Sequence, residues 1–342
     1  MRRLRVLLLM HHDLVPPESI EGLSDAEIHP YKMEFDVRDG LRMLDHEVLP
    51  LGVEDELLPI RRAIDEFKPH IAFNLLMRFH GVGIYDAHVV SYLELLKTAY
   101  TGCNPRGLLL ASDKALSKQV LAFHRIRTPR FGFFRRGGPL GTTRKLRWPL
   151  FVKSTIEHAS TGISQASVVH DRESLAERVA FVHERVGTDA IAEEFIDGRE
   201  FTVGVLGNQR LQAFPVWELR FTKLPEGTAA IATASVKWNL KYQEKLGVVS
   251  GPAENLDEKQ LAQIQHVAKR TYRALGMTGY GRIDMRMDSE GKVYVLEANP
   301  NPDLCFGEDY AEGAEKVGIK YEPLLQRILN LGLRHRPAWK DS

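Results

Sequence analysis

Cysteine is scarce in this chain of 342 residues: only Cys103 and Cys305 are present, far apart in the sequence. Two isolated cysteines exclude the disulfide framework of a small secreted protein and indicate a reduced compartment. No apolar run approaches the roughly 18 residues of a membrane-spanning helix. The apolar run at 6–10 follows a basic N-terminus but is only as long as one strand, so it is not interpreted as a signal peptide. The sequence predicts a cytoplasmic protein.

An excess of charge of one sign is also lacking, with 46 lysine and arginine residues against 45 aspartate and glutamate residues. Without a basic stripe to hold phosphates, nucleic acid is not an expected partner, and without a membrane span neither is a membrane. The chain nevertheless exceeds the length that one hydrophobic core usually supports. Two or three lobes with a cleft between them are therefore expected.

Strand-like and helix-like segments alternate in the first third of the chain. They lie at 5–10, 37–44, 47–51, 58–67, 70–75, 86–97 and 99–101. Such alternation is typical of a parallel sheet covered by helices. The sequence therefore predicts the α/β class, with an open parallel α/β lobe over residues 1–104.

A central lobe is predicted over residues 105–196. Asp113 is expected to cap its first helix. Asp171 is expected to cap a second helix. Strands are expected from apolar content over 150–153, 165–170 and 190–195. These elements predict a small lobe that mixes helices and strands.

A C-terminal lobe is predicted over residues 197–342. Its first two strands are expected over 200–206 and 211–217, on either side of turn residues. A long helix is expected over 257–275, because its first residues have the spacing of a capping box. The intervening segment 220–255 shows little periodicity and is expected to be irregular and mobile.

The sharpest local signal is a pair of alternating runs, 281–287 and 292–299, around a glycine turn. This pattern predicts an antiparallel hairpin in which Asp284 faces Glu297. Asn299 is two residues beyond Glu297 and therefore lies on the same side of the strand. Three oxygen donors are expected to converge at one end of the hairpin.

Two carboxylates and an amide oxygen suit a hard cation such as Mg²⁺, which keeps its other positions for water and phosphate oxygens. Asp284, Glu297 and Asn299 are therefore candidate metal ligands, with Mn²⁺ as an alternative ion. Arg282 could stabilise the charge of a transferring phosphoryl group or of an oxyanion. The simpler alternative is a solvated strand face of alternating charge.

Two further segments have the composition of a nucleotide site. Lys153 ends a strand and precedes a loop of small residues, 154–162, that can bind phosphates, although such sequences also mark ordinary turns. In the segment 193–200, Phe195 and Ile196 could flank an adenine ring, or the segment is an acidic turn between lobes. The order of these segments along the chain favours the nucleotide interpretation.

A lysine-ending strand, a small-residue loop, an acidic linker and a carboxylate hairpin, in this order, resemble the ATP-grasp superfamily, and most closely its D-alanine:D-alanine ligases. The resemblance covers about residues 100–299. It is carried by Tyr-Thr-Gly at 100–102, Ser-Asp-Lys-Ala-Leu-Ser-Lys at 112–118, Glu-Phe-Thr-Val-Gly-Val-Leu-Gly at 200–207, Gly-Arg-Ile-Asp at 281–284 and Leu-Glu-Ala-Asn at 296–299. It implies an ATP-grasp fold and an ATP-dependent ligase.

The resemblance also implies a role for individual positions. It implies that the ATP phosphates contact Lys114, Lys153, Ser160, Thr161 and Gly162. It implies that the adenine and ribose contact Glu193, Phe195, Ile196 and Glu200, with Glu157 near the purine or supporting the loop. It assigns two magnesium ions to Asp284, Glu297 and Asn299, and catalytic roles to Arg282, Lys237 and Ser160. It further implies a homodimer.

Three departures from the ligases bear on the substrates. Where the ligases have a glycine-rich turn and a glutamate that holds the first D-alanine, this chain has His11 and His12. Its phosphate loop reads His-Ala-Ser-Thr-Gly at 158–162 instead of Gly-Ser-Ser-x-Gly. Asp303 stands where glycine is expected, and either faces a cationic acceptor or caps the next turn. His11, His12 and Asp303 are therefore candidate substrate residues. Both amino-acid pockets are expected to differ from those of the ligases.

The expected reaction joins a small carboxylate to a small amine, with amino acids as the expected kind of substrate, through an acyl phosphate formed from ATP. The alternatives are D-alanine:D-alanine ligase activity itself, phosphorylation of a small molecule, and an ATP-binding protein without turnover. A stable phosphorylated product would favour the kinase. The complete set of Asp284, Glu297 and Asn299 argues against lost turnover.

Overall fold

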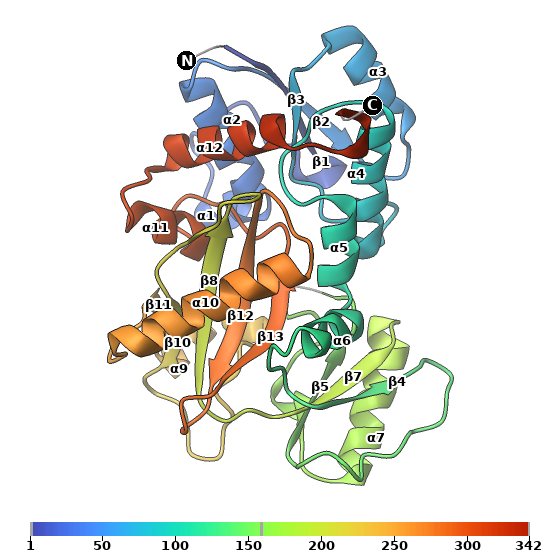
Figure 1. Ribbon diagram of the computed structural model, residues 1–342, viewed down its shortest axis with the longest axis vertical. Coiled ribbons are helices and arrows are strands. Elements are labelled where there is room, and N and C mark those ends of the chain that lie inside the picture. The colour runs from blue at the N-terminus through green and yellow to red at the C-terminus, as the bar shows by residue number, and fades with distance from the viewer. Residues whose placement is uncertain (1–2, 158–159, 341–342) are drawn as a thin grey trace.

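The computed structural model describes residues 3–157 and 160–340, except the side chains of residues 237, 238 and 240 (Figure 1). The described strands form sheets of three, six and four strands. In Figure 1 the three-stranded sheet lies at the top, the six-stranded sheet in the middle and the four-stranded sheet at the bottom. The predicted α/β class is confirmed.

The N-terminal sheet is parallel, in the order β2-β1-β3, as predicted. Its strands are β1 (Arg5–His11), β2 (Glu47–Val53) and β3 (Ile71–Asn74). The helices between and after them are α1 (Asp25–Ile28), α2 (Lys32–Met43), α3 (Leu58–Phe67) and α4 (Asp86–Leu95). The strand expected at 99–101 is reduced to one bridge, between Ala72 and Tyr100.

The last long helix, α12 (Tyr321–Arg334), packs against α2 of the N-terminal part (Figure 1). One apolar core contains Leu8 and Phe73 of the parallel sheet together with Leu325 and Ile328 of α12. The end of the chain therefore helps to cover the first sheet. The lobe boundaries at 104 and 196 stay predictions.

The central helices begin at capping residues. Asn104 caps α5 (Pro105–Ser112), a helix that was not predicted, and Asp113 caps α6 (Lys114–Phe123) as predicted. Asp171 accepts a hydrogen bond from the backbone of Ser174 and caps α7 (Arg172–Phe181), also as predicted. Each cap satisfies backbone N–H groups that have no partner within the helix.

The central sheet is antiparallel, in the order β4-β7-β5-β6. Its strands are β4 (Phe131–Phe134), β5 (Leu150–Ser154), β6 (Val168–Val169) and β7 (Ala190–Glu194). The strand expected over 165–170 is wrong in length, because a 3₁₀ turn held by Ser164 and Ser167 occupies its first half. Strand β4 was not predicted.

The largest sheet has the order β11-β10-β8-β12-β13, with β9 paired to β8. Its strands are β8 (Arg199–Leu206), β9 (Gln212–Ala213), β10 (Trp217–Phe221), β11 (Val248–Pro252), β12 (Tyr280–Met287) and β13 (Val293–Asn299). The single strand expected over 211–217 is wrong. Pro215 lies between β9 and β10 and has no N–H to donate to a ladder, which separates the two pairings.

The segment expected to be irregular, 220–255, contains α8 (Ala234–Trp238), α9 (Leu240–Leu246) and the edge strand β11, so that part of the prediction is wrong. Its mobility stays a prediction. The long helix α10 (Glu258–Ala274) begins with the predicted capping box of Asp257 and Gln260. The short helix α11 (Asp309–Glu315) follows the β12–β13 hairpin.

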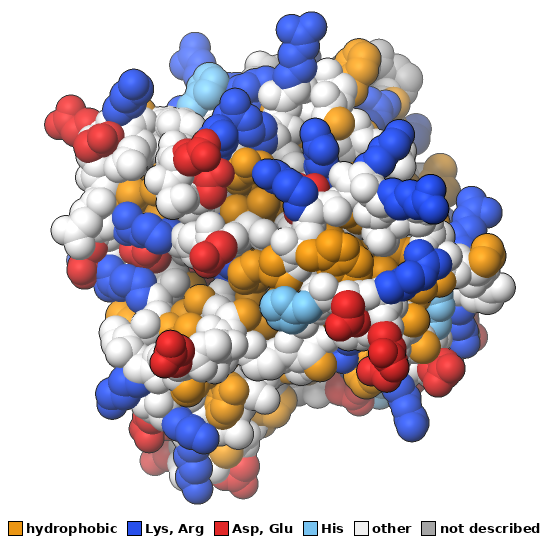
Figure 2. Space-filling view, turned by 90° about the horizontal axis from the view of Figure 1, so that it is seen from below, with side chains coloured by type: hydrophobic (Ala, Val, Ile, Leu, Met, Phe, Trp, Pro, Cys, Tyr) orange, Lys and Arg blue, Asp and Glu red, His pale blue; other side chains and the backbone are white. Residues whose placement is uncertain are grey.

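Charged groups of both signs are scattered over the face shown in Figure 2, among hydrophobic and uncharged side chains. This agrees with the net charge of only +1. Within residues 3–157 and 160–340, no helix has both the length and the apolar content needed to cross a bilayer.

Candidate active site

The hairpin of β12 and β13 has the predicted register at its functional end. Asp284 faces Glu297, and Arg282 faces Asn299. A bulge between Asp284 and Met285 shifts the register on the turn side, and this irregularity was not predicted. Bulges change the direction in which neighbouring side chains point. The bulge lies immediately beside the two facing carboxylates.

Asp284 accepts hydrogen bonds from two neighbouring side chains. Arg282 donates to both of its oxygens, at 2.8 and 3.0 Å, and Asn299 Nδ2 donates to Asp284 Oδ2 at 3.0 Å. Arg282 Nη1 also lies 3.1 Å from Asp309 Oδ2 of α11. Burial alone would lower the pKa of Arg282, but the carboxylates of Asp284 and Asp309 more than reverse this and raise it. Arg282 is therefore a fixed cation beside the predicted metal ligands.

Three buried lysines converge near this hairpin. Lys114 Nζ, at the start of α6, lies 3.5 Å from Glu297 Oε2 and donates to the carbonyl of Glu157 at 2.6 Å. Lys118 Nζ, one turn further along α6, lies 3.2 Å from Glu193 Oε1, and Lys153 Nζ on β5 lies 3.4 Å from the same oxygen. The sequence had singled out Lys114 and Lys153 but not Lys118.

Burial and charge act against each other at these lysines. Burial lowers the pKa of Lys118 to about 8, although Glu193 raises it. Burial also lowers the pKa of Lys114, with Glu297 opposing. For Lys153 the burial effect is outweighed by Glu193 and Glu297, and its pKa is raised. Glu193 Oε1 is in ion-pair range of both lysines without a hydrogen bond to either, so two buried ammonium charges share one carboxylate.

The linker after β7 is held by Arg286, a buried side chain on β12 that was not predicted. Arg286 bonds Glu200 Oε2 through two nitrogens, at 3.0 and 2.8 Å, and donates to the carbonyl of Ile196 at 2.9 Å. Its guanidinium lies 5.0 Å from the centre of the Phe195 ring. Three of the four residues predicted to contact adenine and ribose, all except Glu193, are therefore brought together by one arginine.

The phosphate loop is only partly described, because His158 and Ala159 lie outside the described residues. Ser160 has a φ of 61° and Gly162 a φ of 71°, the left-handed region that favours glycine. Ser160 Oγ donates to the carbonyl of Ala232 at 2.7 Å, and Arg178 donates to the carbonyl of Gly162. Thr161 lies exposed between them. The loop therefore contacts the segment that precedes α8.

The predicted substrate residues lie at two places. His11 is the last residue of β1 and His12 follows it, with the two ring centres 4.7 Å apart. Asp303 is exposed, and its Oδ1 accepts a hydrogen bond from the backbone of Cys305 at 2.7 Å. In the described part of the chain, no hydrogen bond or ion pair joins the two histidines to Asp303. The side chain of Lys237, on α8, lies outside the described residues, and its catalytic role stays a prediction.

A buried carboxylate near Asp303 was missed by the sequence reasoning. Glu34, in the first turn of α2, is 1% exposed, and its Oε1 has no hydrogen-bond partner. Burial, together with the nearby charge of Asp303, raises its pKa to about 7. A glutamate within a helical run gives no sequence signal of burial, because the core around it is formed by distant segments.

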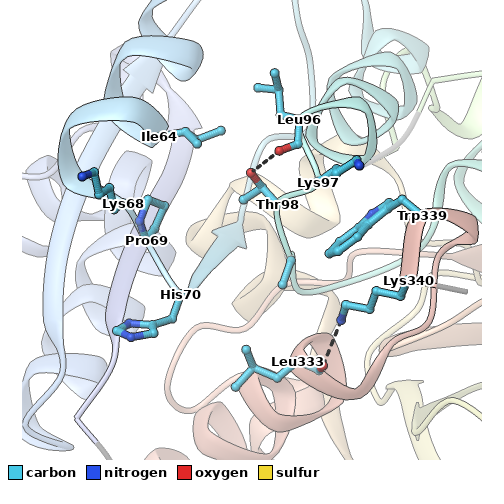
Figure 3. Close-up of a pocket in the computed structure, with 11 residues that line it drawn as sticks. Ile64, Lys68, Pro69, His70, Leu96, Lys97, Thr98, Leu333, Trp339 and Lys340 are labelled. Atoms are coloured by element: carbon cyan, nitrogen blue, oxygen red, sulfur yellow. Dashed lines mark hydrogen bonds between the residues drawn. The ribbon is translucent and has the colours of Figure 1, made fainter. Parts of the chain in front are cut away.

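A pocket of about 480 Å³ lies elsewhere (Figure 3). Its walls include the segments around His70 and Thr98, which precede β3 and Tyr100, and Trp339 near the end of the chain. It therefore lies at the amino end of the parallel strands, whereas ligands of open α/β sheets bind at the carboxyl end. None of the predicted site residues lines this pocket, and the convergence of charged groups is the better guide to the chemistry.

The C-terminal region matches a family model described as the D-ala D-ala ligase C-terminus, over residues 125–330. A D-alanine–D-alanine ligase of Bordetella petrii is 32% identical over 287 residues, which cover 83% of each chain. The chain belongs to the D-alanine–D-alanine ligase family. An uncharacterized protein of Sinorhizobium fredii, y4sG, is also 32% identical, over 264 residues that cover 77% of this chain and 75% of its own.

A solved D-alanine–D-alanine ligase from Bacillus anthracis, in complex with ATP, superposes with a TM-score of 0.72. It is 22% identical in sequence, and the match covers 97% of this chain and 98% of that chain. The predicted D-alanine–D-alanine ligase family, ATP-grasp fold and ligase class are therefore confirmed. The roles assigned to individual residues stay predictions.

Proposed function

We propose that the protein is an ATP- and magnesium-dependent ligase that activates a small carboxylate as an acyl phosphate and couples it to a small amine, with substrates other than two D-alanine molecules. The observation that carries this proposal is the convergence of Lys114, Lys118 and Lys153 beside the Asp284–Glu297 hairpin. Amino acids are the expected kind of substrate. A cytoplasmic homodimer without nucleic-acid or membrane partners belongs to the same proposal.

The buried lysines support a polyanionic ligand. Burying a charge without full compensation is costly, so a site that keeps three lysines against Glu193 and Glu297 is best matched by added negative charge. The phosphates of ATP supply such charge. Lys114 and Lys153 would orient them, and Arg286 would position Glu200 and the Phe195–Ile196 linker for the ribose and adenine.

The donor set of the hairpin fits Mg²⁺, with Mn²⁺ as an alternative. Asp284 and Glu297 are facing carboxylates, and Asn299 lies beside them and contacts Asp284. Hard oxygen ligands of this kind are those that Mg²⁺ prefers. When bound, the ion would neutralise charge on the phosphate oxygens. Asp284, Glu297 and Asn299 are the residues proposed to hold it.

In this proposal Arg282 would stabilise charge on the reacting carboxylate. Asp284 and Asp309 fix its guanidinium from two sides, so its orientation is set before any substrate binds. In the proposed reaction it steadies the acyl phosphate and then the oxyanion formed when the amine attacks. The segment around α8, which contacts Ser160 through Ala232, would close over the site and exclude water.

The departures in the substrate residues support a change of substrate. His11 and His12 occupy the end of β1, and Asp303 adds a charge after the hairpin, near buried Glu34. The charge of Asp303 favours a substrate with an amino group distant from the reacting centre. The second candidate function is D-alanine–D-alanine ligase activity itself, which the identity with the Bordetella petrii enzyme favours.

A screen of ADP release tests the proposal. Purified protein with ATP and Mg²⁺ would be given pairs of amino acids, amines and small carboxylates, with products identified by mass spectrometry. An amide product with stoichiometric ADP, and little D-alanyl-D-alanine, is expected. Efficient dipeptide synthesis from D-alanine would overturn the change of substrate, and a stable phosphorylated product would indicate a kinase.

A further inference from the structure

A cluster of two imidazoles and a carboxylate lies at the carboxyl end of β1, in His11, His12 and Asp13. His11 Nδ1 lies 3.4 Å from Asp13 Oδ2, and His12 Nε2 lies 2.9 Å from Asp13 Oδ1. One ligand atom from each residue lies within 4.8 Å of the others. The carboxyl end of a central parallel strand is the edge at which open α/β sheets bind ligands.

Two hydrogen-bond acceptors of this cluster, His11 Nδ1 and Asp13 Oδ2, face each other. The backbone N–H of Asp13 donates to His11 Nδ1 at 3.4 Å, so Nδ1 acts as an acceptor. The same Nδ1 faces Asp13 Oδ2, which is also an acceptor when ionised. Two acceptor atoms that face each other in this way repel, and a bound cation would relieve the repulsion.

The surrounding strands hold the cluster in place. His11 is only 5% exposed and lies within the β1 pairing. A side chain at Gly52 on β2 would place its Cβ 2.8 Å from the Cα of His12, so the glycine permits the turn that carries His12 to pack against β2. Glu54 Oε2 lies 3.8 Å from His12 Nδ1 and adds a further oxygen nearby.

We propose that His11, His12 and Asp13 bind a divalent transition-metal ion of the Zn²⁺ class. Two imidazole nitrogens with one carboxylate are typical ligands of such ions, whereas Mg²⁺ prefers oxygen alone. The ion would keep an open position toward solvent for water or a substrate group. This site is separate from the hairpin of Asp284, Glu297 and Asn299.

Arg78 is the competing cation. Its Nη2 lies 3.5 Å from Asp13 Oδ2, at the long end of ion-pair distances, and its side chain is half exposed. The guanidinium now offsets the charge of the carboxylate and must move away when a metal binds. Arg78→Gln should therefore bind Zn²⁺ more tightly than the unaltered chain, a result that a purely structural ion pair would not give.

The test is a Zn²⁺ titration of the full chain against a chromophoric chelator, without ATP or Mg²⁺. One ion per chain is expected, and His12→Ala and Asp13→Asn should each bind at least about tenfold more weakly, since even loss of an outer contact to a metal ligand has that effect. His124→Ala, an exposed histidine after α6, is the matched control and should bind as the unaltered chain does.

Asp284→Asn separates this site from the hairpin. The variant should still bind one Zn²⁺ ion even if ligase turnover is lost, so the two proposals fail independently. Thermal melts of each variant establish that it is folded. Undiminished Zn²⁺ binding in folded His12→Ala and Asp13→Asn, or absence of binding in the unaltered chain, would overturn the proposal.

Discussion

Lys118 Nζ lies 3.2 Å from Glu193 Oε1, and both side chains are almost completely buried. Lys153 Nζ approaches the same oxygen at 3.4 Å. One carboxylate therefore compensates two buried ammonium groups that come from different elements, α6 and β5. Lys118 also donates to the carbonyl of Leu296 on β13 at 3.0 Å. These contacts connect α6 both to the central sheet and to the β12–β13 hairpin.

Glu193→Gln is expected to destabilise the fold strongly. It leaves the charges of Lys118 and Lys153 buried without their carboxylate, and breaking a buried pair in this way costs about 3 to 5 kcal/mol. Urea unfolding at pH 7 measures the change. Glu184→Gln, an exposed glutamate after α7, is the matched control and should change stability by less than about 0.5 kcal/mol.

The loss of unfolding free energy caused by Glu193→Gln should be smaller at pH 9.5 than at pH 7. Burial lowers the pKa of Lys118 to about 8 in the folded state, below its ordinary value of 10.5, so the penalty of burying its charge is relieved as the pH rises through about 8. A deficit below about 1 kcal/mol at pH 7 would contradict the account of these charges.

Glu34→Gln should change the pH dependence of stability. Burial raises the pKa of Glu34 to about 7 from an ordinary 4.5, so its proton contributes stability that is fully present below pH 4.5 and is lost as the pH rises through about 7. Between pH 4.5 and 8, the free energy of unfolding of the unaltered chain should therefore fall by about 3 kcal/mol more than that of Glu34→Gln. Urea unfolding at several pH values measures this. Parallel curves for the two proteins would show that Glu34 is solvated.

Asp303 can be tested by separating its charge from its hydrogen bond. Asp303→Asn keeps an oxygen that can accept from the backbone of Cys305 but removes the charge, whereas Asp303→Ala removes both. If the charge recognises an amine, both variants should raise KM for a cationic acceptor with little change in KM for ATP. If Asp303 only caps the turn, Asp303→Ala should melt earlier, and acceptor selectivity should be unchanged in both.

The hairpin could be predicted from the sequence because strand periodicity and a glycine turn fix which side chains face each other. Asp284 and Glu297 were placed correctly for that reason. The bulge beside them could not be predicted, because a single extra residue on one strand leaves no signal in the alternation of side chains. Lys118 and Arg286 had weaker signals: Lys118 is four residues after Lys114 on one helix face, and Arg286 alternates with Arg282 and Asp284 on β12.

Other features depend on contacts between distant segments. The alternating pattern at 211–217 suggested one strand, but Pro215 divides it between two pairings. The helices of the segment 220–255 are too short for a clear period, and short helices depend on tertiary packing for their stability. The packing of α12 on the first sheet likewise has no signal in the order of elements along the chain.

The most direct test of the proposed chemistry is ADP release by Glu297→Gln and Asp284→Asn, with ATP, Mg²⁺ and the substrate pair found in the screen. Each substitution removes a carboxylate charge from the proposed metal site. Glu297 is partly exposed, so its variant should melt close to the unaltered chain. The account predicts loss of turnover in both folded variants. Unaltered rates of ADP release in either folded variant would contradict it and remove the hairpin from the mechanism.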